Sequence, residues 1–287
     1  MRPRAAKLLP LFILSLGACN EAPDPVSDPV VYERIVTLAP NLAELVYAAG
    51  ASNALVGVSA YSDYPPEVLE LTVVGDAFMI DQEQLTILGP DPLIVWQGGT
   101  PAHVVDELKS AGYTVEVIRT NSLTDVADAI LRIGALTGNK AIARRSVAAY
   151  RSELDTLAAS FEGREDISVF YQVSRRPLFT INGKHYVSEL IALCGGSNIF
   201  ADLTDLAPSI DVESVVERDP EVMLASSDAG DDAFGEWDRW PGIAANRYDN
   251  RFLMPADAIG RATPRLVQAA RAVCSALEDA RERKASG

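Results

Sequence analysis

The side chains best suited to chemistry in this chain are aromatic residues that follow predicted strands. Tyr61 lies in the run Tyr-Ser-Asp-Tyr-Pro-Pro after one predicted strand, and Trp96 precedes Gly98 and Gly99 at the end of another. Ligands of open α/β sheets bind beyond the carboxyl ends of the strands, and aromatic rings offer a flat apolar face with a polar handle. These four residues are therefore candidate ligand contacts, and core packing is the alternative for the two rings.

A charged pair lies at a strand end in the second half of the chain. Asp257 and Arg261 bracket the turn after the predicted strand Arg-Phe-Leu-Met-Pro. By the same strand-end rule they are candidate polar contacts for a ligand. A local salt bridge between them is the alternative.

Motifs of the common catalytic classes are missing from the sequence. It contains no Gly-x-Ser-x-Gly elbow, no P-loop and no His-Glu-x-x-His. With only His103 and His185 available, a histidine-built zinc or catalytic site has little support. We expect His103 on the surface of a helix and His185 in a structural loop. The acid-rich stretch 228–238 lacks EF-hand spacing and is interpreted as a solvated loop.

Composition excludes two broad classes of protein. The chain has 287 residues, of which 48% are hydrophobic and 23% charged, which is typical of a folded protein rather than a disordered one. Its net charge is −15. Nucleic-acid binding depends on Lys and Arg neutralising phosphates, so no nucleic-acid partner is expected.

The first residues have the pattern of an export signal. Three basic residues precede an apolar run at 8–16 and a Leu-Gly-Ala-Cys sequence that ends at Cys19. The run is shorter than the ~20 residues that span a bilayer. The sequence resembles a lipobox, so we predict removal of 1–18 and lipidation of Cys19, with a plain signal peptide as the alternative. Residues 19–32 are predicted to tether the folded body to the membrane.

Lipidation of one cysteine would leave two others, Cys194 and Cys274. An even number in an oxidising compartment favours a disulfide. Two buried free thiols are the alternative.

Hydrophobic patterns predict two α/β lobes. Short β-branched runs alternate with helical patterns, and from 139 to 162 the sequence has no Gly or Pro, which predicts one helix of ~35 Å. The class is therefore α/β, with two Rossmann-like lobes joined by a long rigid α-helix. The predicted ranges are 33–137 for the N-terminal lobe, 138–163 for the helix and 164–284 for the C-terminal lobe.

An internal repeat supports two lobes of common origin. Glu44-Leu-Val-Tyr-Ala-Ala-Gly is echoed by Glu189-Leu-Ile-Ala-Leu-Cys-Gly, and the segment from Glu83 by the segment from Glu213. Glu83 and Glu213 should therefore occupy equivalent positions. In the first copy we also expect Asn41 to cap the helix together with Glu44.

At this point the sequence resembles a known family, the substrate-binding proteins of ABC importers in which a rigid helix joins two lobes. Within that family it is most similar to the cobalamin-binding proteins, over about residues 33–280. The motifs that carry the resemblance are Arg34-Ile-Val-Thr-Leu-Ala-Pro, Tyr61-Ser-Asp-Tyr-Pro-Pro, Trp96 with Gly98-Gly99, Cys194-Gly-Gly-Ser-Asn-Ile-Phe and Arg261-Ala-Thr-Pro-Arg.

The resemblance implies a role for each candidate residue. Tyr61 and Trp96 match aromatic corrinoid contacts, and Asp257 and Arg261 match polar contacts of the second lobe. Glu83 and Glu213 match the two acids that dock on arginines of a membrane permease dimer. Cys194 and Cys274 match the family's disulfide. A monomeric periplasmic carrier with no cofactor of its own is expected.

Departures from the cobalamin-binding pattern leave the ligand open. Small residues stand where those proteins have large aromatics, namely Ala77, Val173, Ala207 and Ala258. Either the ligand differs, or Phe78, Met79 and Tyr171 refill the space.

Arginine supplies a second departure. Arg175 and Arg176 occupy a strand-end turn that the relatives make without charge, and two guanidiniums beside Arg261 would suit carboxylates, as on haem or an anionic ferric chelate. Corrinoid is the preferred ligand, and haem or a ferric siderophore is the alternative. An enzyme acting on such a ligand, or a scaffold, is less favoured.

Overall fold

The computed structural model describes residues 30–286. The predicted signal sequence, Cys19 and most of the predicted tether lie outside the described residues. Within 30–286 the structure has no helix with the length and apolar character needed to cross a membrane.

The first lobe is an open parallel sheet with the strand order β3-β2-β1-β4-β5. Its central strand consists of Ile, Val and Thr, all fully buried, as expected for β-branched residues covered on both faces. The strands are β1 (Ile35–Thr37), β2 (Leu55–Val58), β3 (Thr72–Val73), β4 (Leu93–Trp96) and β5 (Val115–Ile118). The helices are α1 (Pro40–Ala48), α2 (Gln82–Leu88), α3 (Ala102–Ser110) and α4 (Leu123–Leu136).

The second lobe repeats this plan. Its parallel sheet has the order β11-β10-β6-β9, so β9-β6-β10-β11 corresponds to β2-β1-β4-β5, and a short antiparallel hairpin, β7 with β8, is added. The strands are β6 (Ile167–Gln172), β7 (Ser174–Arg175), β8 (Leu178–Phe179), β9 (Gly196–Asn198), β10 (Val222–Ser226) and β11 (Arg251–Met254). The helices are α6 (Tyr186–Leu193), α7 (Val212–Arg218), α8 (Ala244–Arg247), α9 (Ala256–Ile259) and α10 (Leu266–Ser286). The predicted two-lobed α/β class is confirmed.

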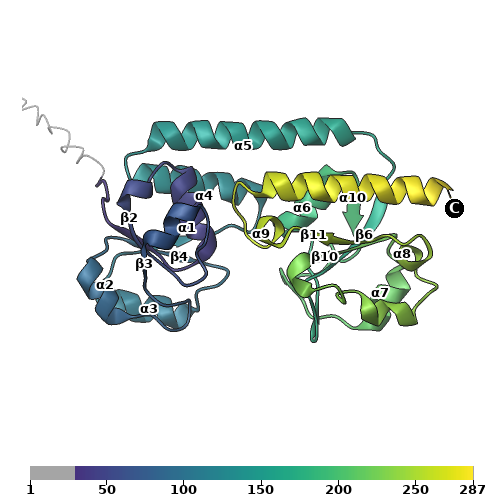
Figure 1. Cartoon of the computed structure of the whole chain (residues 1–287), viewed down its shortest axis with the longest axis horizontal. Coiled ribbons are helices and arrows are strands. Elements are labelled where there is room, and N and C mark those ends of the chain that lie inside the picture. Colours follow the sequence, from purple (N-terminus) through teal and green to yellow (C-terminus); the bar gives the residue numbers. More distant parts are fainter. Residues whose placement is uncertain (1–29, 287) are drawn as a thin grey trace, which may run out of the picture. The chain divides into compact units, whose positions relative to one another are not determined.

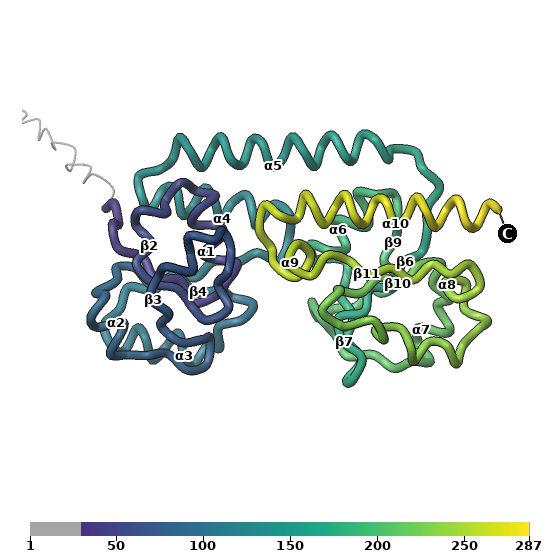
Figure 2. The backbone as a smooth tube through the Cα atoms, viewed as in Figure 1, coloured from purple at the N-terminus to yellow at the C-terminus, as the bar shows by residue number. Residues whose placement is uncertain are grey.

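One long helix, α5 (Lys140–Phe161), joins the lobes, and Figures 1 and 2 show it passing alongside α10 before the chain enters β6. At 1.5 Å per residue its 22 residues span ~33 Å. Four residues of one face are buried, at positions 143, 147, 150 and 154. The run without Gly or Pro at 139–162 located this helix to within one residue at each end, and the predicted range 138–163 is two residues too long at each end.

Two local predictions from the sequence were wrong or incomplete. Helix α1 begins at Pro40 with Ala39 as N-cap and no side-chain cap, so Asn41 and Glu44 are not capping residues; both are buried instead. A proline at the first helical position is already set to the helical φ. Helix α4, which begins with a capping box between Ser122 and Asp125, was not predicted.

The acid-rich stretch 228–238 is not simply a solvated loop. Its apolar residues Ala233, Phe234 and Trp237 belong to a core cluster of the second lobe. The indole Nε1 of Trp237 donates to Oε1 of Gln172 at 2.8 Å. The apolar residues between the acids therefore anchor this segment to the end of β6.

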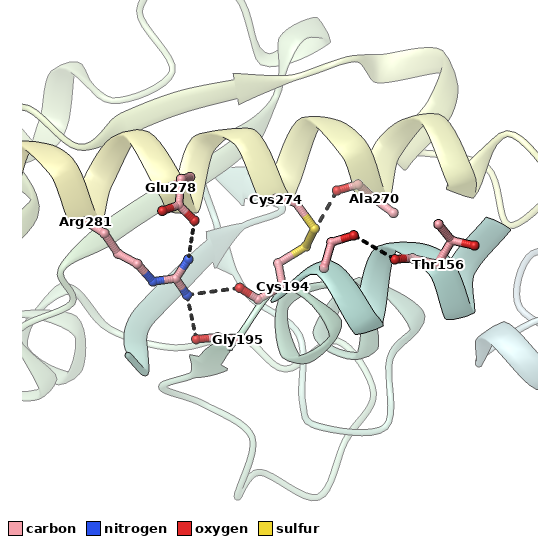
Figure 3. The surroundings of a disulfide bond; sticks show 8 residues. Thr156, Cys194, Gly195, Ala270, Cys274, Glu278 and Arg281 are labelled. Atoms are coloured by element: carbon pink, nitrogen blue, oxygen red, sulfur yellow. Dashed lines mark hydrogen bonds and ion pairs between the residues drawn. A yellow bond between two sulfur atoms is a disulfide. The ribbon is translucent and has the colours of Figure 1, made fainter. Parts of the chain in front are cut away.

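The predicted disulfide between Cys194 and Cys274 is confirmed, with 4.8 Å between the two Cα atoms. It ties the end of α6 to α10, and Figure 3 shows Arg281 of α10 beside it. Nη2 of Arg281 donates to the carbonyl oxygens of Cys194 at 3.0 Å and Gly195 at 2.8 Å. A link across 80 residues contributes ~4 kcal/mol in the chain-entropy model.

The two histidines occupy structural and surface positions. His103 is exposed on α3. His185 is the N-cap of α6, where its Nδ1 accepts the backbone N–H of Val187 at 3.2 Å. Burial lowers the pKa of His185 from 6.5 to about 4.

Replacing His185 with Asn should flatten the acid side of the stability profile. The unfolded chain binds the His185 proton below 6.5 and the folded chain only near 4, so stability is lost as the pH falls through this window. The loss is on the order of 3 kcal/mol. Asn keeps an N-cap acceptor without titrating. Between about pH 7 and pH 4, the free energy of unfolding measured in urea should therefore fall by about 3 kcal/mol less in this variant than in the parent. His103→Asn is the control, and an equal pH dependence in both variants would contradict the assignment.

Candidate functional site

The predicted site residues follow the carboxyl ends of strands in both lobes. The strand order of the first sheet reverses between β1 and β4, and the loops after β2 and β4, which carry Tyr61 and Trp96, lie on either side of β1. In the second lobe, Asp257 lies in α9, directly after β11. The strand ends of an open α/β sheet are where its ligands bind.

The ring of Trp96 rests on the glycines that follow it. A Cβ on Gly98 would lie 2.8 Å from Cζ2 of the indole, and one on Gly99 would lie 2.5 Å from Cε3. Only glycine allows the backbone this close to the ring. Within the described residues, the buried Nε1 of Trp96 has no hydrogen-bond partner.

Tyr61 presents its ring to solvent. The residue is 81% exposed, so core packing does not explain it. Its φ of 66° lies in the left-handed region, which is uncommon for residues other than glycine. Its carbonyl oxygen accepts from Nη2 of Arg261 at 3.3 Å, a contact that helps to hold this conformation.

Arg261 connects the second lobe to the first. Its Nη1 lies 3.2 Å from Oε1 of Glu44 and also binds Oδ1 of Asp63, while its Nη2 lies 3.2 Å from Oδ2 of Asp63. The pair with Asp63 is bidentate, the geometry that a planar guanidinium favours. The predicted alternative of a local salt bridge with Asp257 is wrong, because every acid that contacts Arg261 belongs to the other lobe.

Burial and the neighbouring arginines shift the pKa values of Glu44 and Asp63 in opposite directions. The side chain of Glu44 is 3% exposed, and burial raises its pKa although Thr263, Arg261 and Arg265 oppose that shift. Asp63 is half exposed, and its hydrogen bond with Arg261 lowers its pKa. Its contribution to stability is therefore present above its ordinary pKa and is lost as the pH falls through the lowered one.

Arg265 adds a second connection between the lobes. Its guanidinium lies 4.5 Å from the ring centroid of Tyr64, and its Nη1 is 3.5 Å from Oε1 of Glu44. Its Nη2 is 3.6 Å from Oδ2 of Asp257. Asp257 is thus paired with Arg265 rather than Arg261. The runs Tyr-Ser-Asp-Tyr-Pro-Pro and Arg-Ala-Thr-Pro-Arg meet across the lobes.

The other two predicted arginines lie on the β7 hairpin, which Figure 2 shows projecting from the second lobe. Nη1 of Arg175 lies 2.8 Å from Oδ2 of Asp232, so this guanidinium already has an acid in its own lobe. Arg176 is exposed.

The four small residues expected in the cleft are not alike. Ala258 is fully buried and presents no surface, whereas Val173 and Ala207 are exposed and Ala77 is half-buried. Tyr171 is buried and does not refill the space. Phe78 and Met79 are exposed in a turn whose N–H groups are both held at 2.8 Å by Oδ1 of Asp76. Of the three proposed substitutes, only these two remain available.

Glu83 and Glu213 occupy matching positions, one in each lobe. Each is the exposed second residue of a seven-residue helix whose N-cap is an Asp, residue 81 in α2 and 211 in α7. Both helices end at a residue with a left-handed backbone, Gly89 and Asp219. The predicted equivalence of the two glutamates is confirmed by this geometry, whereas their docking role stays a prediction.

Sequence reasoning missed the acids that hold the arginines. Asp63 and Glu44 both stood in motifs that it had singled out, but a run of letters does not identify a partner in the other lobe. Among residues 30–286 no group of three or more His, Cys, Asp or Glu side chains is arranged to hold a metal ion.

Adding a methyl group at Gly99 should displace the Trp96 ring. Since the added Cβ would lie 2.5 Å from the indole, Gly99→Ala forces this half-buried ring outward, and tryptophan emission should move to longer wavelength. In a Trp96→Phe background the same substitution should change nothing. Gly242→Ala is the matched control, because a Cβ there meets no atom within 4 Å. An emission spectrum equal to that of the parent would contradict the described ring position.

Comparisons with known proteins agree with this architecture. The chain is 35% identical over 277 residues to the vitamin B12-binding protein of Vibrio parahaemolyticus, covering 96% of this chain and 97% of the relative. The crystal structure of the periplasmic vitamin B12-binding protein BtuF of Vibrio cholerae matches with a TM-score of 0.78 at 34% identity, over 88% of this chain and 100% of that one. The periplasmic haem-binding protein HutB of Vibrio cholerae shares the fold, with a TM-score of 0.73 at 23% identity over 85% and 98% of the two chains. The family model described as periplasmic binding protein matches residues 35–258, and the chain belongs to that family.

Proposed function

We propose that this protein is the substrate-binding component of an ABC importer, which binds a corrinoid between its lobes and delivers it to the membrane permease. The observation that carries the proposal is the identity of 34–35% over nearly the full chain with proteins named for vitamin B12 binding. The role is that of a carrier, which releases its ligand unchanged. It works as a monomer in the periplasm and uses no cofactor of its own.

The chemistry of the strand ends suits a corrinoid. A corrinoid has a broad ring edged with amide groups, which both donate and accept hydrogen bonds. Tyr61 offers an exposed ring for the broad face, and Trp96 offers the accessible part of a half-buried indole. Gly98 and Gly99 keep the chain close beneath the indole.

Haem or a ferric siderophore is the second candidate, and Arg176 is the observation that favours it. This guanidinium is exposed at the tip of the β7 hairpin, where a carboxylate can reach it. Arg175 contributes less than its position suggested, because Asp232 already neutralises it.

Visible absorption after desalting distinguishes these ligands. The purified protein is incubated separately with cyanocobalamin, haem and a ferric siderophore, and unbound ligand is removed. We expect about one equivalent of cyanocobalamin to remain, with an unaltered absorption spectrum, and Trp96→Ala to retain less. Retention of haem alone, lost in Arg176→Ala, would establish the second candidate instead. A chemically changed ligand would show that the protein is an enzyme.

Docking on the permease is the proposed role of Glu83 and Glu213. They occur once per lobe at equivalent helix starts, and both are exposed. A pair of this kind can contact one basic residue in each half of a two-fold symmetric permease. The lipid on Cys19 is proposed to hold the carrier at the membrane through the tether, as the lipobox pattern suggests.

Reversing both charges should abolish uptake without affecting binding. In Glu83→Arg with Glu213→Arg, like charges would meet at the permease, where correct pairs add to affinity and steer association. We expect cyanocobalamin affinity within about twofold of the parent, well under 1 kcal/mol, and loss of cobalamin uptake in cells. Glu107→Arg with Glu217→Arg makes the same change of charge at other exposed positions and should transport normally. Normal uptake by the Glu83 and Glu213 variant would refute docking through these residues.

A further inference from the structure

A second pair of equivalent glutamates has no part in the proposed function. Glu44 in α1 and Glu189 in α6 each stand six residues before a glycine with positive φ, Gly50 at 75° and Gly195 at 72°. Each helix follows the strand that occupies the same place in its sheet, β1 in the first lobe and β6 in the second. The two glutamates are therefore the same position of the repeated fold.

Glu44 extends from the first lobe to the second. Its side chain is 3% exposed, and its Oε1 lies 3.2 Å from Nη1 of Arg261 and 3.5 Å from Nη1 of Arg265. Both arginines precede Leu266, the first residue of α10. Glu44 thus holds the start of the last helix of the opposite lobe.

Glu189 makes the corresponding contact in the other direction. Its Oε2 accepts the backbone N–H of Leu123 at 2.7 Å. Leu123 is the first residue of α4, where N–H groups lack partners within the helix and the helix dipole favours a negative charge. The second lobe therefore holds the start of the last helix of the first.

These two contacts are reciprocal. Helix α4 follows β5 and α10 comes after β11, and these two strands lie at the same edge of their sheets. In each direction a glutamate from the first helix of one lobe binds the start of the last helix of the other. The contact between the lobes is therefore made twice, once by the buried Glu44 and once by the half-buried Glu189.

The long helix by itself does not fix the angle between the lobes. Helix α5 is stiff along its length, but the chain enters and leaves it through Gly138 and Gly163, both in left-handed turns with φ of 74°. Hinges are a few residues at the ends of elements that absorb changes in φ and ψ. Contacts between the lobes must therefore supply the resistance to rotation.

We infer that Glu44 and Glu189 are a reciprocal pair of clamps between the lobes, which hold them at one angle and so keep the proposed ligand cleft preformed before ligand binds. A rotation that parts the lobes removes the partners of the buried Glu44 and the half-buried Glu189 at once, and a carboxylate that loses its partner away from water is strongly unfavourable. Both glutamates act as positioning residues, and the inference holds whichever ligand occupies the cleft.

Distance measurements between spin labels in the ligand-free protein test this directly. Nitroxides are attached at Lys109→Cys in α3 and Glu217→Cys in α7, both exposed, in full-length protein carrying Cys19→Ser, where the disulfide occupies the remaining cysteines. Glu44→Ala with Glu189→Ala should broaden the distance distribution between the lobes at least twofold, and each single variant should broaden it less.

Glu153→Ala is the matched control. It removes an exposed ion pair between α5 and Arg271 of α10, and it should leave the distribution at its parent width. Circular dichroism and retention of the disulfide establish that each variant is folded. If the double variant does not fold, the distance distributions of the two single variants provide the test. Unchanged distributions in folded Glu44→Ala and Glu189→Ala would overturn the inference. Because no ligand is used, this result is independent of whether the protein binds a corrinoid.

Discussion

The arrangement of the two lobes depends on one buried carboxylate. Glu44 lies inside the first lobe at 3% exposure, where an unpaired charge would be prohibitively unfavourable, and its compensating arginines come from the second lobe. The same arginines bind Asp63 and Tyr64 in the loop after β2. The requirement to neutralise one side chain therefore fixes which loops of the two lobes meet.

Repetition of one topology explains why residues far apart in the sequence lie at corresponding strand ends of the two lobes. Each lobe is an open parallel sheet whose loops at the carboxyl ends are free to carry function. The first lobe contributes Tyr61 and Trp96, and the second contributes Asp257 and Arg261. The same repetition places Glu83 and Glu213 at matching helix starts. The proposed ligand contacts and the proposed permease contacts therefore lie in different loops of one scaffold, so each can change without the other.

Local patterns predicted the elements well, and partners between lobes poorly. The limits of α5 follow from an uninterrupted run of helix formers. The predicted capping role of Glu44 failed because a short-range rule was applied to a residue whose partners are 217 and 221 residues away. From the sequence, Arg261 could be either a ligand contact or the ion-pair partner of Asp257, because the sequence does not show that Asp63 contacts it.

The crowding of Arg261 constrains how a ligand can use it. Its two terminal nitrogens already contact Glu44, Asp63 and the carbonyl of Tyr61. The side chain of Glu44 is 3% exposed, whereas that of Asp63 is 52% exposed. A ligand acceptor can therefore replace Asp63 on Arg261 at a lower cost than Glu44, because the displaced carboxylate of Asp63 is already in contact with water. A neutral acceptor such as an amide oxygen would leave the carboxylate of Asp63 in solvent and the arginine neutralised by Glu44. The geometry therefore suits a ligand with amide groups at its edge better than one that must bring its own charge to this arginine.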